Sequence, residues 1–118
     1  MEGSLRNISP AVFERVILMP ETYRVRITPL VLAELQGIFD FIAKDSPQNA
    51  AKMIGKLLDA IDGLNIFPHR YDVPRIGGGR GVKIRSMPVW PYLVRYRIDD
   101  ETKTVFILRV RHGSRQRP

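Results

Sequence analysis

Cysteine is absent from this chain of 118 residues, and histidine occurs only twice. The lack of cysteine excludes a disulfide framework, a thiolate metal site and a cysteine nucleophile. With two histidines and no cysteine, the chain has too few nitrogen and sulfur ligands to favour a dedicated zinc site. We therefore expect no bound metal.

Long hydrophobic runs and the common cofactor motifs are missing as well. No apolar run approaches the ~18 residues that a membrane span needs, and the N-terminus lacks the basic-then-apolar pattern of a signal peptide. The glycine run at 77–81 is neither a Walker loop nor a dinucleotide fingerprint, and no Gly-x-Ser-x-Gly motif occurs. We expect no cofactor and no membrane partner. These features of the sequence are compatible with a protein of the cytoplasm.

Arginine is what the chain has in excess. The formal net charge is +7, from 19 Lys and Arg against 12 Asp and Glu, and 14 of the 19 basic residues are Arg. Residues 1–68 contain 7 basic and 8 acidic side chains, whereas residues 69–118 contain 12 and 4. Because the guanidinium fork suits phosphates and carboxylates, the second part predicts a polyanionic or acidic partner. The alternative is a basic surface that only confers solubility.

Two pairs of a hydroxyl residue and proline mark the starts of two helices. Apolar residues at helical spacing follow both Thr28-Pro29 and Ser46-Pro47. The apolar face of the first helix comprises Val31, Leu35, Ile38 and Ile42, widened by Leu32, Phe39 and Phe41. Gly37 is expected to let a second helix approach closely, and Pro68 predicts that this second helix ends near Ile66-Phe67. The short link between the helices predicts an antiparallel hairpin.

Alternating apolar and polar residues predict four strands. The first runs from Tyr23 to Thr28, and three more cover Val82 to Arg85, Tyr92 to Ile98 and Val105 to Arg111. Short connections predict that the last three form an antiparallel meander. We expect an α+β domain over 23–118, ordered βααβββ, with the helix pair packed on one face of the sheet. Residues 1–22 are expected to be an N-terminal extension with a short helix over 10–18.

Basic side chains alternate with apolar ones along these strands. If Tyr92, Val94, Tyr96 and Ile98 face the helices, then Arg95 and Arg97 face away from them. On the preceding strand, Lys83 and Arg85 lie on the polar side. On the last strand, strict alternation puts one set of residues on one face and a second set on the other. The first set is Phe106, Leu108 and Val110, and the second is Val105, Ile107, Arg109 and Arg111. Like charges on adjacent strands repel unless solvent or a partner screens them. The pattern predicts either an anion-binding face or a solvated one.

The C-terminal part also offers groups for acid–base chemistry. A site that cleaves RNA needs a base for the 2′-hydroxyl, a cation for the phosphate and an acid for the leaving oxygen. Residues of the right types are His112, Arg115, Arg85 and Tyr92. The alternative, that His112 is a hydrogen-bonding surface residue, is the more common case for a lone histidine.

Several short segments, taken in order, point to a known family. They are Ala33 to Ile42, Ala43 to Pro47 with Ala50-Ala51, Leu64 to Pro68, Gly79-Arg80, Pro91 to Tyr96 and Ile107 to Arg115. Through them the chain from about Tyr23 to Arg115 resembles the RelE/ParE toxin superfamily, in particular its ParE-like, plasmid-stabilisation branch. The closing Val-x-His-Gly-x-Arg pattern favours that branch, and Lys83 is the only lysine on the central strands, where the RelE-like branch has a lysine-rich set.

The resemblance implies the toxin of a type II toxin–antitoxin pair, a protein that a cognate antitoxin neutralises. For the ParE-like branch it implies inhibition of DNA gyrase without catalysis, in a homodimer or in a hetero-oligomer with the antitoxin. For the RelE-like branch it implies cleavage of mRNA on the ribosome. The expected target-binding residues are Arg80, Lys83, Arg85, Arg95, Arg97, Arg109, Arg111, His112 and Arg115.

Overall fold

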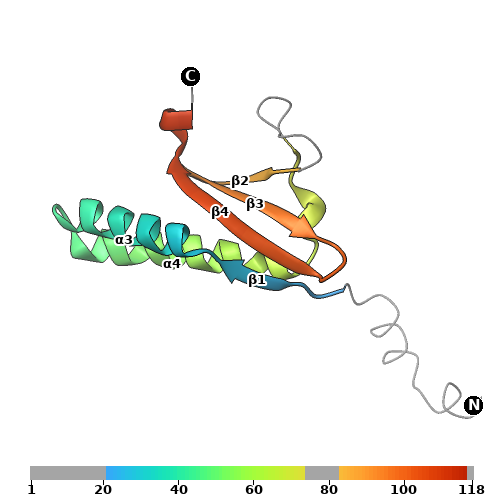
Figure 1. The fold of residues 1–118 in the computed structure, drawn as a ribbon. Coiled ribbons are helices and arrows are strands. Elements are labelled where there is room, and N and C mark those ends of the chain that lie inside the picture. The colour runs from blue at the N-terminus through green and yellow to red at the C-terminus, as the bar shows by residue number, and fades with distance from the viewer. Residues whose placement is uncertain (1–20, 74–82, 117–118) are drawn as a thin grey trace, which may run out of the picture.

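The computed structural model describes residues 21–73 and 83–116, and Figure 1 shows how they are arranged. The expected helix over 10–18, the glycine run and Arg80 lie outside these residues. The elements are β1 (Arg24–Ile27), α3 (Pro29–Ala43), α4 (Pro47–Asp62), β2 (Arg85–Val89), β3 (Tyr92–Asp99) and β4 (Thr104–His112). Short 3₁₀ turns follow α4 at Gly63–Asn65 and Pro68–Arg70, and η3 (Gly113–Gln116) follows β4.

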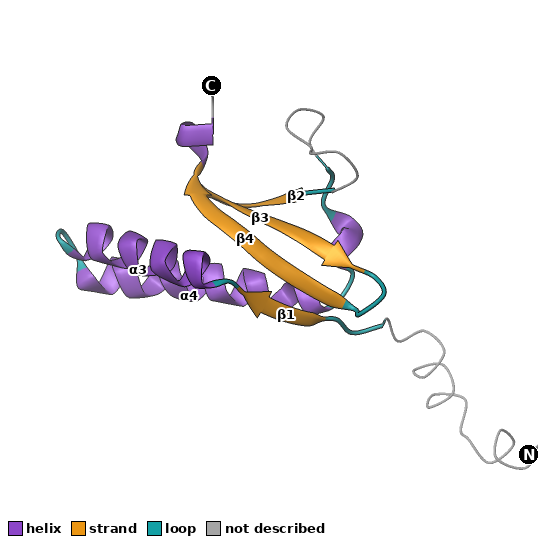
Figure 2. Cartoon of the chain, viewed as in Figure 1, coloured by secondary structure: helices purple, strands orange, loops and turns teal. Residues whose placement is uncertain are grey.

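The sheet has four strands in the order β1-β4-β3-β2. The last three strands form the expected antiparallel meander, and β1 lies parallel to β4. The helix pair lies on one face of this sheet, which confirms the predicted α+β fold (Figure 2). No helix in the described ranges is long and apolar enough to cross a membrane.

Both helices begin where the hydroxyl–proline pairs predict. The Thr28 hydroxyl accepts the amide of Val31 at 3.4 Å, and the Ser46 hydroxyl accepts the amide of Asn49 at 3.1 Å. The end of the second helix is wrong by one turn, because α4 stops at Asp62. Gly63, a weak helix former, begins a tighter 3₁₀ turn there, and that turn buries Leu64 fully.

Strand β2 starts later than the predicted strand over Val82 to Arg85. It runs along the edge of the sheet, where Pro88, which has no amide hydrogen, is tolerated. Met87 and Val89 are buried there against the helices. The alternation of buried and exposed residues in this strand therefore begins after Arg85, the last residue of the predicted strand.

A bulge in β4 overturns the strict alternation expected for that strand. Arg95 is opposite Arg109, but Tyr96 is opposite Ile107, so Leu108 is an extra residue with no partner. The core therefore receives Val105 and Ile107 before the bulge and Val110 after it, and not Leu108 with Val110. The buried side chains of β3 that meet them are Tyr92, Val94 and Tyr96, as predicted.

Two apolar residues assigned to the buried face of the first helix lie at the surface instead. Leu32 is 57% exposed and Phe41 is 65% exposed. Val31 and Leu35 are buried as expected. An α-helical face about 100° wide is filled by these buried positions, so Leu32 and Phe41 lie at its two margins, in contact with water.

A polar cluster closes the end of the sheet where β3 turns into β4. The Tyr23 hydroxyl donates to Asp100 at 2.8 Å, and His69 Nε2 lies 3.2 Å from the same carboxylate. These hydrogen bonds, that of Tyr23 first, lower the pKa of Asp100. The cluster joins the start of β1, the turn after α4 and the β3–β4 turn.

Tyr96 is the largest fully buried side chain in the described ranges, and its hydroxyl donates to the Pro68 carbonyl at 2.6 Å. We expect Tyr96→Phe to lower the free energy of unfolding by about 1–3 kcal/mol, because the buried carbonyl loses its donor. Burial also raises the pKa of the Tyr96 phenol to about 12.

Because the folded-state pKa of Tyr96 exceeds the unfolded value of ~10, its contribution to stability is complete below pH ~10 and declines as the pH rises toward 12. Denaturant unfolding at a series of alkaline pH values measures this decline, which Tyr96→Phe should reduce. The same alkaline slope in both proteins would contradict the assignment.

Candidate functional site

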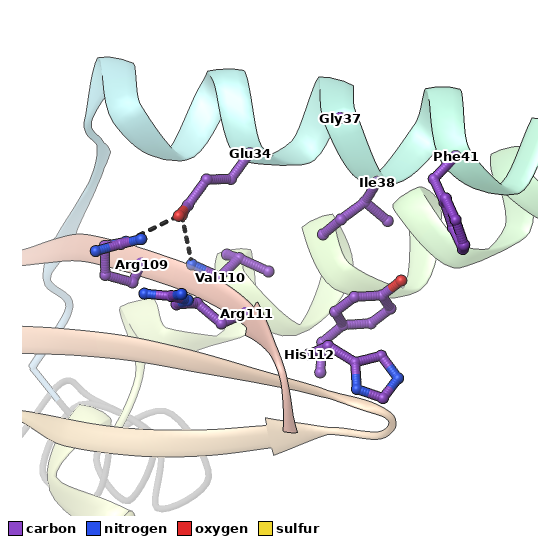
Figure 3. Close-up of a pocket in the computed structure, with 9 residues that line it drawn as sticks. Glu34, Gly37, Ile38, Phe41, Arg109, Val110, Arg111 and His112 are labelled. Carbon is purple, nitrogen blue, oxygen red and sulfur yellow. Dashed lines mark hydrogen bonds and ion pairs between the residues drawn. The ribbon is translucent and has the colours of Figure 1, made fainter. Parts of the chain in front are cut away.

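A pocket of about 440 Å³ lies between α3 and the C-terminal half of β4 (Figure 3). Its lining residues are Glu34, Gly37, Ile38, Phe41, Tyr92, Arg109, Val110, Arg111 and His112. The walls are apolar side chains of both elements, and the charged groups come from Glu34 and the two arginines. The size suits a small ligand or a side chain of a partner protein.

The pocket exists because β1 is shorter than β4. Pairing between the two strands ends at Ile27 and Ile107, where Thr28 turns the chain into α3 and donates its hydroxyl to the Ile107 carbonyl at 3.0 Å. Beyond that point β4 has no strand neighbour on this side. Helix α3 passes over the open edge instead, and the space between them forms the pocket.

Glu34 takes over the role of the missing strand. One carboxylate oxygen accepts the Val110 amide at 2.7 Å, and the other accepts Arg109 Nε at 2.8 Å. The Glu34 side chain is only 16% exposed, so both hydrogen bonds are sheltered from water. Glu34 cannot be predicted as a site residue from the sequence, since a single acidic residue in a helix gives no signal of a contact some 75 residues away.

His112 and Tyr92 meet at the far end of the pocket. Their rings contact edge to face, with centroids 5.5 Å apart. The Ser114 amide donates to His112 Nδ1 at 3.2 Å, and the Ser114 hydroxyl lies 2.8 Å from the same nitrogen. The neutral imidazole therefore has its proton on Nε2, because Nδ1 acts as the acceptor.

Arg85 does not join this pair. It is opposite Tyr96 and so lies on the helix-facing side of the sheet, which corrects its predicted place on the polar side. Its guanidinium donates to the carbonyls of Tyr71 at 2.6 Å and His69 at 3.2 Å. These two hydrogen bonds attach the loop after α4 to strand β2. Val89 is the residue of β2 that pairs with Tyr92, and Arg85 lies four positions away along the strand. Arg85 is therefore about 13 Å from Tyr92 along the strand direction.

The other expected residues divide between the sheet and its borders. Arg95 and Arg97 point away from the helices as predicted, and the register puts Arg109 and Arg111 on the same side. Arg109 then bends around the open edge of β4 to reach Glu34 (Figure 3). Lys83 is exposed just before β2, and the backbone of Arg115 lies in η3.

Two arginines that sequence analysis did not select belong to the same face. Arg24 and Arg26 are opposite Thr104 and Phe106, and both are exposed. Their alternation with Tyr23, Val25 and Ile27 is visible in the sequence. What the sequence does not reveal is that β1 lies beside β4, which places these two charges next to those of the meander.

Gly37 does not serve the close helix contact expected of it. A side-chain carbon at this position would meet nothing within 4 Å, because the residue faces the open pocket. Among the described residues, no group of three His, Cys, Asp or Glu side chains is arranged to hold a metal ion.

A sequence model for the ParE toxin of type II toxin–antitoxin systems, parDE, matches residues 25–117. The chain belongs to the ParE toxin family. Among the relatives of this ParE-family toxin, the protein Y4kP of Sinorhizobium fredii is 33% identical over 95 residues, which are 80% of this chain and 93% of the relative. Toxin RelE2 of Caulobacter vibrioides is 35% identical over 85 residues, 71% of this chain and 88% of the relative.

Solved structures agree with this membership. The fold of the ParE-family toxin is similar to that in the chromosomal ParDE system of P. aeruginosa, with a TM-score of 0.61, 20% identity and coverage of 78% of this chain and 97% of that one. The toxin–antitoxin complex RelBE2 of Mycobacterium tuberculosis gives a TM-score of 0.51 at 31% identity, with coverage of 77% and 91%. The chain is thus a toxin of the type II toxin–antitoxin class, within the RelE/ParE superfamily.

We expect Glu34→Ala to lower the free energy of unfolding of this ParE-family toxin by about 1–3 kcal/mol, because the Val110 amide loses its acceptor. Glu34→Gln keeps an oxygen for that amide, but its NH2 group replaces the oxygen that accepts Arg109 Nε, so the ion pair and its hydrogen bond are both lost. Because the partly exposed Arg109 can turn to water, we expect a smaller loss than in the alanine variant. Hydrogen exchange at Val110, measured by NMR, should accelerate in the alanine variant and remain slow in the glutamine variant. Equal exchange rates in the two variants would contradict this role of Glu34.

Proposed function

We propose that this toxin binds and inhibits DNA gyrase without catalysing a reaction, and that a cognate antitoxin neutralises it. The main support is the position of Arg85. An RNA-cleaving site built from His112, Tyr92 and Arg85 requires the cation within reach of the same phosphate. Arg85 instead binds two backbone carbonyls about 13 Å along the sheet, where it acts as a structural residue.

The surface available for a target is the basic side of the sheet. Arg95, Arg97 and Arg111 are partly exposed there, and none of them forms an ion pair with any residue in 21–73 or 83–116. Unpaired arginines keep their donors for a partner, and arginine is enriched at the energetic centres of interfaces. This supports a binding surface over a reaction centre.

Ribosome-dependent cleavage of mRNA is the second candidate function. It is favoured by the contact between Tyr92 and His112, which puts a phenol and an imidazole at one end of the pocket. It is also consistent with the similarity to Toxin RelE2. In this case His112 Nε2 and the guanidinium groups of Arg109 and Arg111 are the groups nearest to a bound phosphate.

The antitoxin is supported by the apolar surface of α3. Leu30 and Phe41 are about three helical turns apart and so lie on the same side of α3, where they are 50% and 65% exposed, a costly arrangement in water for a protein that acts alone. The similar structure from Mycobacterium tuberculosis is itself a toxin–antitoxin complex. We infer that an apolar segment of the antitoxin covers this face of α3.

The gyrase proposal is tested with purified toxin in a supercoiling assay. We expect inhibition by the native chain and an increase of at least about tenfold in the inhibitory concentration for the double variant Arg97→Glu, Arg111→Glu, because each change replaces attraction by repulsion. The matched control is Lys52→Glu, Lys56→Glu, which alters the net charge equally on exposed positions of α4.

Uninhibited gyrase at a large excess of native toxin would refute the proposal. Toeprinting on translating ribosomes is the complementary measurement. Cuts at defined codon positions, reduced by His112→Ala, would establish the second function in its place.

For the antitoxin, we expect Phe41→Glu to abolish co-purification of the toxin with the product of a neighbouring antitoxin gene, because a charge cannot be buried there without a partner. Since Phe41 is largely exposed, the thermal midpoint of the toxin alone should hardly change. Lys52→Glu serves as the control on α4. Undiminished co-purification of the Phe41 variant would show that the antitoxin binds elsewhere.

A further inference from the structure

We propose that the sheet face opposite the helices binds the phosphate backbone of duplex DNA. We call it the outer face and define it by Arg24, Arg26, Arg95, Arg97, Phe106 and Arg111, together with the threonines at 102 and 104. The inference deepens the proposed action on gyrase and rests on it for the choice of DNA. It adds β1 to the surface, and it identifies a polyanion as the partner.

The arginines of the outer face form a regular array over three adjacent strands. Arg26 and Arg97 flank Phe106 from either side, since both are opposite it in the register. Alternate residues of a strand are ~7 Å apart, and neighbouring strands are ~4.8 Å apart, so Arg26 and Arg97, with β4 between them, lie ~10 Å apart. The array therefore spaces its positive charges by about 7–10 Å in two directions. Repeating phosphates offer an equally regular array of negative charge, with one charge per ~3.4 Å of each DNA strand.

The protein leaves most of this positive charge uncompensated. The ion pairs within the described ranges are His69–Asp100, Lys103–Glu21 and Arg109–Glu34, and none includes an arginine of the outer face as defined above. Asp99 is opposite Thr104 and so lies on the same face, where its carboxylate accepts the amides of Glu101 and Thr102. One carboxylate beside five arginines leaves the face with a net positive charge. Like charges on adjacent strands are unfavourable until an anion screens them.

A hollow at the β1 end of the outer face has the donors that a phosphate needs. Its volume is about 470 Å³, and its lining includes Arg24, Arg26, Thr102 and Thr104. Arginine is a frequent donor to phosphate oxygens in protein–DNA interfaces. The Thr102 hydroxyl donates to the Thr104 hydroxyl at 3.0 Å, and the Thr104 hydroxyl donates to the Thr102 carbonyl at 3.1 Å. The two arginines therefore supply the donors, and the threonines only line the hollow.

The composition of the face favours contact with the backbone over contact with bases. The aromatic ring among its defining residues, Phe106, lies under the Arg97 guanidinium at 4.2 Å from ring centroid to Cζ. A covered ring cannot stack on an unpaired base, as single-strand binders require. The guanidinium above it keeps its N–H groups for a phosphate. A duplex, which presents phosphates and hides its bases, fits this surface.

The experiment is a salt titration of binding between the full chain and a short fluorescent DNA duplex of arbitrary sequence, followed by anisotropy. Five unpaired arginines predict a slope of about −4.5 in log K against log salt, which weakens binding about 500-fold between 50 and 200 mM salt. In the double variant Arg24→Gln, Arg26→Gln we expect a slope of about −2.7 and a loss of only about 40-fold over the same range. Both residues are exposed, so the variant should fold normally.

The control variant Lys52→Gln, Lys56→Gln removes equal charge from α4, on the other side of the molecule, and should keep the native slope. A duplex with neutral methylphosphonate linkages should not bind. Absence of binding at low salt, an unchanged slope in the Arg24 and Arg26 variant, or an equal reduction in the control would overturn the proposal. Preference for duplex RNA, or displacement by polyglutamate as effective as by DNA, would overturn the choice of DNA.

These measurements contain no gyrase, so they separate the two proposals. DNA binding by a toxin that leaves gyrase active would reject the gyrase proposal alone. Gyrase inhibition that is unaffected by Arg24→Gln, Arg26→Gln, in a toxin that does not bind DNA, would reject the outer-face inference alone.

Discussion

The unequal length of two paired strands is the constraint on which this structure depends. Strand β1 contributes 4 residues and β4 contributes 9, so about half of β4 has no strand on its β1 side. A backbone edge left in this state needs other hydrogen-bond partners. Glu34 supplies one from α3, and that contact fixes the distance between helix and sheet. The pocket and the position of Arg109 follow from it.

Much of the fold could be predicted from the sequence because its signals are local. A hydroxyl residue followed by proline starts each helix, and both caps form with the expected hydrogen bonds. The alternation from Tyr92 to Ile98 correctly separates buried side chains from Arg95 and Arg97. These features depend on residues within a few positions of one another, and the same physical preferences act in the isolated segment and in the folded chain.

The candidate site could be predicted only in part because it depends on pairing between distant segments. The alternation of Val82 to Arg85 puts Arg85 on the wrong face, since its orientation is set by the register with Tyr96 and not by its own neighbours. Arg24 and Arg26 cannot be assigned to the basic face from the sequence, because nothing local shows that β1 joins β4. Glu34 forms its contacts across some 75 residues. In each case the sequence indicates the chemistry of the residue, but the location of the residue depends on pairing between distant segments.

The bulge in β4 affects the shape of the strand but not the choice of side chains that it buries. Leu108 is the one residue of this strand without a partner, and the residues on either side alternate regularly if it is left out. A homologue one residue shorter at this point would bury the same side chains and expose the same arginines. Its β4 would be straighter, however, because a bulge bends and twists the strand. Insertions and deletions at this position would thus let the family reshape its pocket without redesigning its interior.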